Sequence, residues 1–178
     1  MNDYLEMYGL IDGAQRGTHA GCSGTIDNLL IDKTVTWDCH RRKRNLSMAW
    51  IDVKKANDSV DHKRFPVWLS RTVEKLSRSW NTSVVATTKQ GRETSESIRF
   101  LKGLPQGDTL FPRLFTVCLN PIAWKISAGE GYKLCKPNSA TVTDLLFIDD
   151  LKIFASSESK LNRGMESTKS AMEDVGLQ

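Results

Sequence analysis

Apolar positions recur along the chain with two different periods, and these periods predict an alternation of helices and strands. In residues 26–39, four apolar side chains recur near the spacing of a helix: Ile26, Leu29, Leu30 and Trp37. We therefore expect an amphipathic helix there, with Thr25 as its N-cap. The short apolar run LSMAWIDV, residues 46–53, is typical of a buried strand, and this strand would end at Asp52.

The middle of the chain continues the alternation. Residues 54–80 have helical spacing that is broken near Pro66. Two runs rich in β-branched or apolar residues, 82–88 and 96–102, flank the stretch KQGRE. Because Gly91 lies in that stretch, we expect a β-hairpin.

The last third predicts a largely buried helix and a second hairpin. Residues 103–126 return to the helical period, with Pro112 suited to the first turn and Pro121 expected to kink the helix. Two strands and a polar surface helix should follow: residues 141–148, 151–156 and 158–177. This order predicts an α+β fold in which helices cover one face of a mostly antiparallel sheet.

The second hairpin contains two adjacent acids, Asp149 and Asp150, between large apolar residues in LLFIDDLKIF. Aspartate is common at hairpin tips, which is the simplest interpretation of the pair. However, two-residue turns favour Asn-Gly or Asp-Gly because they need positive φ, and this stretch has no glycine. Two negative charges ~4 Å apart repel by about 4 kcal/mol at an effective dielectric of about 20, so a raised pKa or a bound divalent cation is needed.

Asp52 adds a third carboxylate at the end of the earlier strand, 97 residues before Asp149. If the fold brings the three acids together, they form an all-oxygen site that suits Mg²⁺ or Mn²⁺ better than zinc, with room for two metals ~3.5–4 Å apart. The nearby loop KGLPQGD contains Gly103 and Gly107, which let the backbone approach a ligand closely. The same glycines also suit a simple turn between a strand and a helix.

Composition narrows the class of protein without choosing a function. With 178 residues, 39% of them hydrophobic and 26% charged, the chain fits one folded domain and excludes disordered and fibrous classes. Its five tryptophans are expected in the core, and its four cysteines are expected as free thiols. Because no apolar run approaches the ~20 residues that span a bilayer and no signal sequence is seen, we expect a soluble, intracellular protein of the nucleus or cytoplasm, not secreted and without membrane contact.

The net charge of +4 is concentrated in HRRKRN, residues 40–45. This block either contacts phosphates, acts as a nuclear signal, or is a solvated turn before a strand. The candidate nucleic-acid contacts are five basic residues: Arg16, Arg41, Arg42, Lys43 and Arg44.

Three stretches in this order, AWIDVKKANDSVDH, KGLPQGDTLFPRLF and LLFIDDLKIFA, resemble motifs A, B and C of reverse transcriptases, specifically those of non-LTR retrotransposons. The preceding QRGTHAGCSGTIDNLLID is similar to the segment that joins the fingers to the palm in that family, so the resemblance runs from about Tyr8 to the C-terminus. It implies a partial reverse transcriptase domain over residues 1–178. Its fold would be a right-hand polymerase palm, about residues 46–178, with a partial fingers segment, about residues 1–45, and no thumb.

The resemblance also implies a reaction and a set of site residues. The implied catalytic acids and metal ligands are Asp52, Asp149 and Asp150, with the carbonyl of Val53 as a further ligand. The implied nucleotide contacts are Asn57, Gln106 and Gly107. The reaction would be attack of a DNA primer 3′-OH on the α-phosphate of a dNTP, directed by an RNA template and dependent on Mg²⁺ or Mn²⁺.

The sequence departs from the family pattern in two respects. Asn57 stands where the family has Phe or Tyr to block the ribose 2′-OH, so we expect poorer rejection of ribonucleotides. Upstream fingers segments, a motif D lysine and a thumb have no counterpart here. Because these parts supply much of the positioning, we expect an isolated palm to be very slow or inactive, with the missing segments supplied by a longer polyprotein. The alternative is a catalytically inactive retrotransposon remnant that at most binds nucleic acid or a protein partner.

Overall fold

The computed structural model describes residues 5, 7–9, 11–19, 21–61, 71, 75, 81–99, 103–104, 107, 111–135 and 140–177. The helices within these residues are α2 (Thr25–Arg42), α3 (Ala56–Ser59), α5 (Phe111–Ser127) and α6 (Glu158–Val175). The strands are β1 (Ser47–Asp52), β2 (Asn81–Thr82), β3 (Val85–Thr88), β4 (Gly91–Thr94), β5 (Ile98–Arg99), β6 (Tyr132–Lys133), β7 (Thr141–Val142), β8 (Asp144–Phe147) and β9 (Asp150–Ala155).

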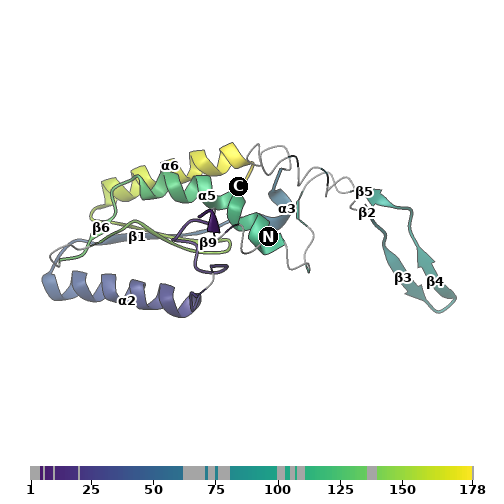
Figure 1. The fold of residues 1–178 in the computed structure, drawn as a ribbon, viewed down its shortest axis with the longest axis horizontal. Helices are drawn as coiled ribbons and strands as arrows, with labels where there is room; N and C mark the ends of the chain where they lie inside the picture. Colours follow the sequence, from purple (N-terminus) through teal and green to yellow (C-terminus); the bar gives the residue numbers. More distant parts are fainter. Residues whose placement is uncertain are drawn as a thin grey trace.

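Three of these strands form the central antiparallel sheet, in the order β1-β9-β8 (Figure 1). β8 and β9 form a hairpin, and β1 pairs with the other edge of β9. The pairing runs from Ser47 opposite Ala155 to Asp52 opposite Asp150. The end of β1 therefore lies beside the tip of the hairpin.

Side chains on the two faces of this sheet belong to two separate apolar clusters. On one face, Leu151 packs in the larger cluster, which α5 and α6 complete. On the other face, Leu145 and Phe154 pack with Val35 of α2. Figure 1 shows the sheet between α2 on one side and α5 with α6 on the other. The prediction that helices cover one face was therefore wrong, because β8 and β9 carry apolar side chains on both faces and both need cover.

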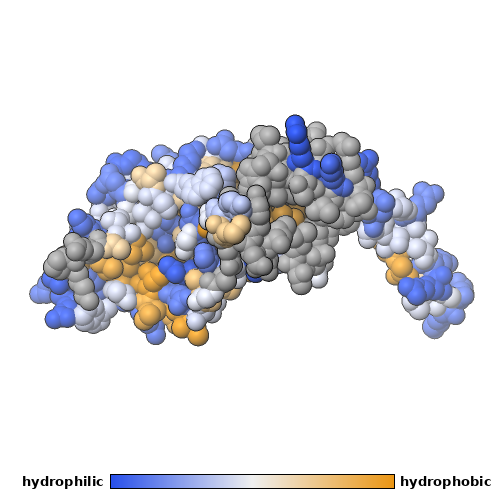
Figure 2. Space-filling view, in the orientation of Figure 1, coloured by the Kyte–Doolittle hydropathy of each residue, from blue (hydrophilic) through white to orange (hydrophobic). Residues whose placement is uncertain are grey.

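The helix α2 forms where the apolar spacing predicted it, but all four apolar side chains of that pattern face solvent. Ile26 is 67% exposed, and Leu29, Leu30 and Trp37 are exposed as well. The buried positions of α2 include Val35 instead. Figure 2 shows apolar residues gathered over the α2 side of the molecule. Throughout, we call these four exposed residues the α2 outer stripe.

The start of α2 also differs from the prediction. Gly24, not Thr25, is the N-cap, with φ 59° and no hydrogen bond from a capping side chain. Asp27, in the first turn, stabilises the start of the helix instead, because its carboxylate accepts the Ser23 N–H at 2.7 Å. The helix therefore begins by a glycine turn and an acid in its first turn.

Other predicted elements are confirmed within the described residues. β1 ends at Asp52. The first hairpin forms, but its strand β4 begins at Gly91, with φ 140°, whereas the sequence placed Gly91 in the loop and the second strand at residues 96–102. The helix α5 continues through Pro121, and α6 begins at the N-cap Ser157. Most of the predicted helix at residues 54–80 lies outside the described residues. Within the described part of the chain, no helix has the length and hydrophobicity needed to cross a membrane.

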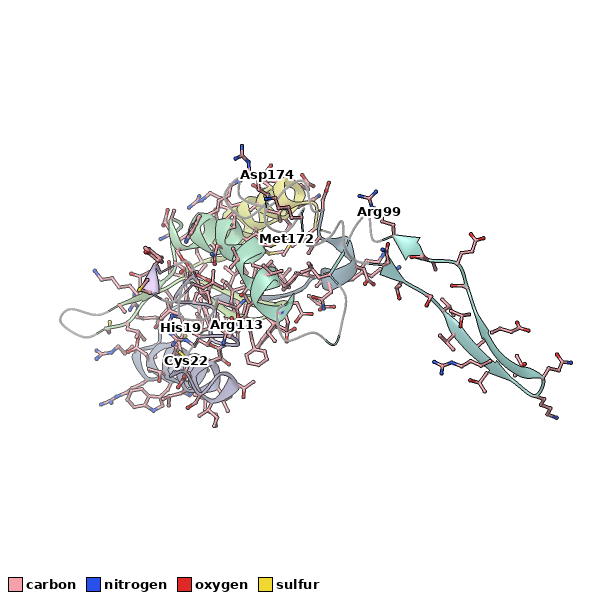
Figure 3. The ribbon with its side chains drawn as sticks, turned by 45° about the vertical axis from the view of Figure 1, so that its right-hand side comes forward. His19, Cys22, Arg99, Arg113, Met172 and Asp174 are labelled. Atoms are coloured by element: carbon pink, nitrogen blue, oxygen red, sulfur yellow. The ribbon has the colours of Figure 1, made fainter. Side chains whose placement is uncertain are left out.

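The hairpin formed by β2 to β5 projects away from the central sheet. Every residue of these four strands is exposed. Figure 3 shows the side chains of this arm pointing outward along its length, with Arg99 near the end that faces the body. A two-stranded ribbon of this kind gains little stability by itself, so the core of the molecule is the central sheet with its flanking helices.

Candidate active site

The sheet register brings together acids that are far apart in the sequence. Asp52 is the last residue of β1, and its partner across the ladder is Asp150, the first residue of β9. Asp149 immediately precedes Asp150 in the turn of the hairpin. Because directly paired residues of two antiparallel strands project on the same face of the sheet, Asp52 and Asp150 share one face.

The three carboxylates have no partner in the described part of the chain. Asp52 and Asp150 are exposed and Asp149 is half-buried. Like charges directly opposite each other on a sheet are destabilising, and a cation at this edge would relieve that repulsion.

The donor set fits magnesium in its chemistry, since all three groups offer carboxylate oxygens. Among the described residues, no group of three or more His, Cys, Asp or Glu side chains is arranged to hold a metal. Magnesium in nucleotide enzymes uses one or two carboxylates, and substrate phosphates and water provide its other ligands. The paired Asp52 and Asp150, with Asp149 beside them, match that pattern.

The turn itself differs from the sequence prediction of an Asp-Asp tip. Phe147 pairs with Asp150, so the two tip residues are Ile148 and Asp149. Ile148 has φ 57°, and Asp149 has no positive φ. A positive φ at the first tip position is the pattern of a type II′ turn, where glycine is favoured. The backbone strain therefore falls on Ile148, and the acids occupy ordinary conformations.

A short N-terminal segment lies beside the hairpin on its outer edge. Gln15 forms an isolated parallel bridge with Leu146 of β8. The Arg16 N–H donates to the Leu146 carbonyl at 3.2 Å, and the Leu146 N–H donates to the Ala14 carbonyl at 3.2 Å. The Asn28 side chain of α2 donates to the same Leu146 carbonyl at 3.1 Å. Residues 14–16 thus support the strand that leads into the acidic turn.

A pocket of about 230 Å³ lies next to Asp150 on the α2 side of the sheet. Lys152 lines it and is only 4% exposed. Its Nζ lies 2.5 Å from Asp32 Oδ1 and 4.3 Å from the centroid of the Trp50 ring. The positive charge of Lys152 is thus paired with α2 rather than with the acids at the turn.

The tryptophans were expected in the core, and this prediction was wrong for the described ones. Trp50 lies two residues before Asp52 and is 72% exposed, and Trp37 and Trp124 are exposed too. In the strand β1, exposed residues alternate with half-buried ones, so Trp50 and Asp52 project on the same face. This is the α2 side of the sheet, and it stays open at β1 because β1 is an edge strand. An exposed aromatic ring therefore lies on the sheet surface beside the acids.

The glycine loop contacts the segment that follows β1. Gly103 has φ 82°, and a Cβ there would lie 3.0 Å from the Asp58 Cα. The Leu104 N–H donates to the Asn57 carbonyl at 2.8 Å, and the Gly103 N–H donates to the Val60 carbonyl at 2.9 Å. Gly103 therefore permits packing against α3, which favours the alternative of a turn between a strand and a helix at this position.

The remaining predicted site residues lie around this contact. Gly107 is exposed with φ 103°, and nothing lies within 4 Å of a Cβ placed there, so this glycine leaves open space. Val53, which follows β1, has its side chain buried in the larger apolar cluster. Gln106 lies outside the described residues.

The five basic candidates do not form one surface. Arg16 lies beside the acidic hairpin, whereas Arg41, Arg42, Lys43 and Arg44 lie at the far end of α2. An 18-residue helix is ~27 Å long, which separates the two groups. The block at residues 41–44 ends a helix and precedes β1, so it occupies the position of the predicted turn before a strand.

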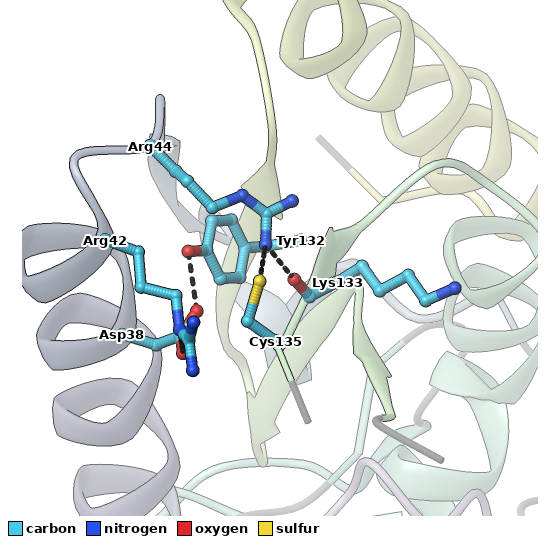
Figure 4. Close-up of polar contacts among 6 residues, drawn as sticks. All are labelled: Asp38, Arg42, Arg44, Tyr132, Lys133 and Cys135. Carbon is cyan, nitrogen blue, oxygen red and sulfur yellow. Dashed lines mark hydrogen bonds and ion pairs between the residues drawn. The ribbon is translucent and has the colours of Figure 1, made fainter. Parts of the chain in front are cut away.

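The residues of the basic block make local contacts (Figure 4). Arg42 lies 3.4 Å from the Asp38 carboxylate, and Arg44 donates to the Lys133 carbonyl at 2.8 Å. The Tyr132 hydroxyl donates to Asp38 at 3.0 Å. Burial, followed by this bond to Asp38, raises the pKa of Tyr132 to about 12. These contacts join α2 to β6.

Comparison with known proteins places the chain in a family. The family model described as reverse transcriptase (RNA-dependent DNA polymerase) matches residues 4–178. The chain is 24% identical over 180 residues to the retrovirus-related Pol polyprotein from type-1 retrotransposable element R2 of Nasonia vitripennis, covering 96% of this chain and 17% of that protein. It is 26% identical over 172 residues to the Pol polyprotein from type-2 retrotransposable element R2DM of Drosophila melanogaster, covering 93% of this chain and 16% of that protein.

A solved structure shares the fold. Apo telomerase from Candida tropicalis, truncated from its C-terminal domain, has a TM-score of 0.52 and 15% sequence identity, covering 98% of this chain and 37% of that chain. At this identity, the likeness concerns the fold alone. The chain spans less than a fifth of the length of the two curated relatives.

Proposed function

Since the chain belongs to the reverse transcriptase family, we propose that it forms the palm of an RNA-directed DNA polymerase, with part of the fingers. The register of β1 on β9 carries this proposal, because it sets Asp52 opposite Asp150 beside the turn that holds Asp149. We assign about residues 1–45 to the fingers side and about residues 46–178 to the palm. Both parts share one core, since Ile11 packs in the same cluster as α5 and α6.

In this proposal the three acids hold Mg²⁺ or Mn²⁺, with Asp52 and Asp149 as the principal ligands and Asp150 and the Val53 carbonyl beside them. The metal, when bound, activates a primer 3′-OH and stabilises the leaving phosphate oxygen. The exposure of Asp52 and Asp150 and their lack of partners within the described residues support this role, because their oxygens are available to a ligand.

The substrate lies on the same open face in this proposal. Gly107 gives the backbone room to approach the incoming dNTP, because it has open space around it. Asn57 and Gln106 contact the same nucleotide, and the RNA template and DNA primer continue over the sheet past Trp50. Arg16, beside the acidic hairpin, and the basic block at residues 41–44 contact phosphates at separate places along this nucleic acid.

Primer extension tests the proposal. Because further polymerase segments supply much of the positioning, we expect addition by the isolated chain to be very slow. Any addition of a dNTP to a DNA primer on an RNA template should require Mg²⁺ or Mn²⁺, and Asp149→Asn should abolish it. Asp27→Asn is the matched control, because Asp27 is an acid of α2 whose carboxylate accepts the Ser23 N–H just before its own helix. Extension that persists in Asp149→Asn would contradict the assignment of the acids.

A second candidate is a catalytically inactive remnant that binds nucleic acid or a protein partner. The α2 outer stripe favours it, since exposed apolar side chains on one helix face are typical of a surface that another protein segment covers. Fingers and thumb segments of a longer polyprotein are the partner that this candidate implies. Salt-sensitive binding to an RNA·DNA duplex without any extension would support it over the polymerase. The intracellular location expected from the sequence stays a prediction.

A further inference from the structure

One buried side chain contacts both peptide groups of the residue that precedes Asp149. Gln15 is 1% exposed. Its Oε1 accepts the Ile148 N–H at 2.8 Å, and its Nε2 donates to the Ile148 carbonyl at 3.1 Å. A glutamine amide has one acceptor and one donor side, so this single group satisfies the N–H and the carbonyl of the same turn residue.

Ile148 is a residue that needs such support. Its φ of 57° lies in the left-handed region, which β-branched residues strongly disfavour and which glycine adopts freely. A turn with a disfavoured residue at its first tip position persists only when its surroundings hold it. The two bonds from Gln15 are the contacts, among the described residues, that bind the backbone of Ile148 outside its own hairpin.

The segment that carries Gln15 is itself held in place. The Gln15 N–H donates to the Asp12 carbonyl at 3.0 Å, and the Asp12 N–H donates to Asn120 of α5 at 3.1 Å. Gly17 completes the fit, because a Cβ at that position would lie 2.9 Å from the Ile148 Cγ1. The side chain of Gln15 thus reaches the turn from an anchored backbone, and Gly17 leaves room for Ile148.

We propose that Gln15 is a positioning residue, whose amide holds Ile148 at positive φ and thereby fixes the direction of Asp149 and the pairing of Asp150 with Asp52. The inference rests on the proposed function, because the direction of these acids matters only if they bind a metal. A merely structural role for Gln15 would be to fill and satisfy a buried site. The two roles differ in what should happen when Ile148 no longer needs to be held.

The experiment uses the full 178-residue chain and four variants: Gln15→Met, Ile148→Gly, the double variant, and Asn28→Ala as the matched control. Met has nearly the shape of Gln and lacks both hydrogen-bonding groups. Asn28 also bonds the hairpin, at the Leu146 carbonyl, but does not contact Ile148. Native-state hydrogen exchange of the Ile148 amide measures, without any metal, how firmly the Gln15 side chain holds Ile148. Mn²⁺ affinity, from the electron paramagnetic resonance signal of free Mn²⁺, measures the direction of the acids.

In Gln15→Met we expect exchange at Ile148 to rise by about tenfold or more, as the loss of one or two buried hydrogen bonds implies, and Mn²⁺ affinity to fall by a similar factor. Asn28→Ala should change neither the exchange at Ile148 nor the affinity. In the Ile148→Gly background, where the turn needs no support, Gln15→Met should cost less than about threefold in Mn²⁺ affinity. This rescue is the signature of positioning, because a filling role would cost the same in both backgrounds.

Two results would overturn the inference. One is unchanged exchange at Ile148 in Gln15→Met. The other is an equal loss of Mn²⁺ affinity with and without Ile148→Gly. If Gln15→Met does not fold, Gln15→Glu replaces it, since Glu keeps the acceptor for the Ile148 N–H and loses the donor. If the proposed function fails, Asp149→Asn will not weaken the Mn²⁺ binding of wild type. Exchange at Ile148 will still show whether Gln15 holds that residue.

Discussion

Asp144, the first residue of β8, is the acid whose burial gives the clearest effect of pH on stability. It is 6% exposed, and its Oδ2 has no hydrogen-bond partner among the described residues. Its Oδ1 accepts from the Thr143 hydroxyl at 2.6 Å and from the Ser127 hydroxyl at 3.4 Å. Burial is the main reason that the pKa of Asp144 is raised to about 6, and the nearby charge of Asp12 adds to it.

The sign of the effect follows from proton binding. Between the unfolded pKa of 3.8 and the folded pKa of about 6, the folded state of Asp144 binds more protons than the unfolded state. The free energy of unfolding therefore falls as pH rises through this window. A shift of this size corresponds to about 3 kcal/mol, because each pKa unit is worth about 1.4 kcal/mol.

We predict that Asp144→Asn removes this loss. The free energy of unfolding of the variant, minus that of wild type, should rise by about 3 kcal/mol from about pH 3.5 to about pH 7.5. Urea denaturation at a series of pH values measures it. Asp174→Asn is the control, since Asp174 is exposed in a pair with Lys125 and should matter little at any pH. A difference between Asp144→Asn and wild type that stays constant with pH would refute the reasoning.

Three further predictions concern other sites. Lys152→Met should destabilise the fold by about 3–5 kcal/mol in urea denaturation, because it leaves Asp32 unpaired. Adding Asp32→Asn should recover part of this loss, and additive losses would contradict a stabilising ion pair between the two residues. Asn57→Tyr should increase discrimination against ribonucleotides in primer extension, and equal discrimination would refute the role of Asn57. Burial raises the pKa of the Cys118 thiol far above its usual range, so a thiol reagent followed by mass spectrometry should label exposed Cys135 and spare Cys118 in the folded chain; labelling of both at one rate would contradict this.

The sequence predicted the elements that hold the acids because their signals are local. The apolar run before Asp52 and the paired runs around Asp149 specify strands by themselves. The ends of β1 and β9 agree with the prediction to within one residue, whereas the run at 141–148 is divided into β7 and β8. The pairing of β1 with β9 needed the family resemblance, since no local signal joins segments nearly 100 residues apart. The resemblance supplied the roles of the acids, and these roles stay proposals.

Other features could not be predicted because they depend on packing between segments. The α2 outer stripe follows a helical period, and that period cannot say whether the apolar face meets the core or solvent. The strain at the turn falls on Ile148 because Phe147 pairs with Asp150, and the residue types alone placed the tip one position later. Gln15 lies in a segment rich in Gly and Thr that predicts only a loop, so no pattern of residues singles it out.

Binding of Mn²⁺ to the full chain tests the central claim most directly. Because a ligand that binds only the native state raises its melting temperature, we predict that the melting temperature of wild type rises with Mn²⁺ concentration. The rise should be largely lost in Asp52→Asn and in Asp149→Asn, and it should remain in Asp27→Asn. A rise of the same size in all four proteins, or none in wild type, would contradict the claim that Asp52 and the acids of the hairpin form one metal site.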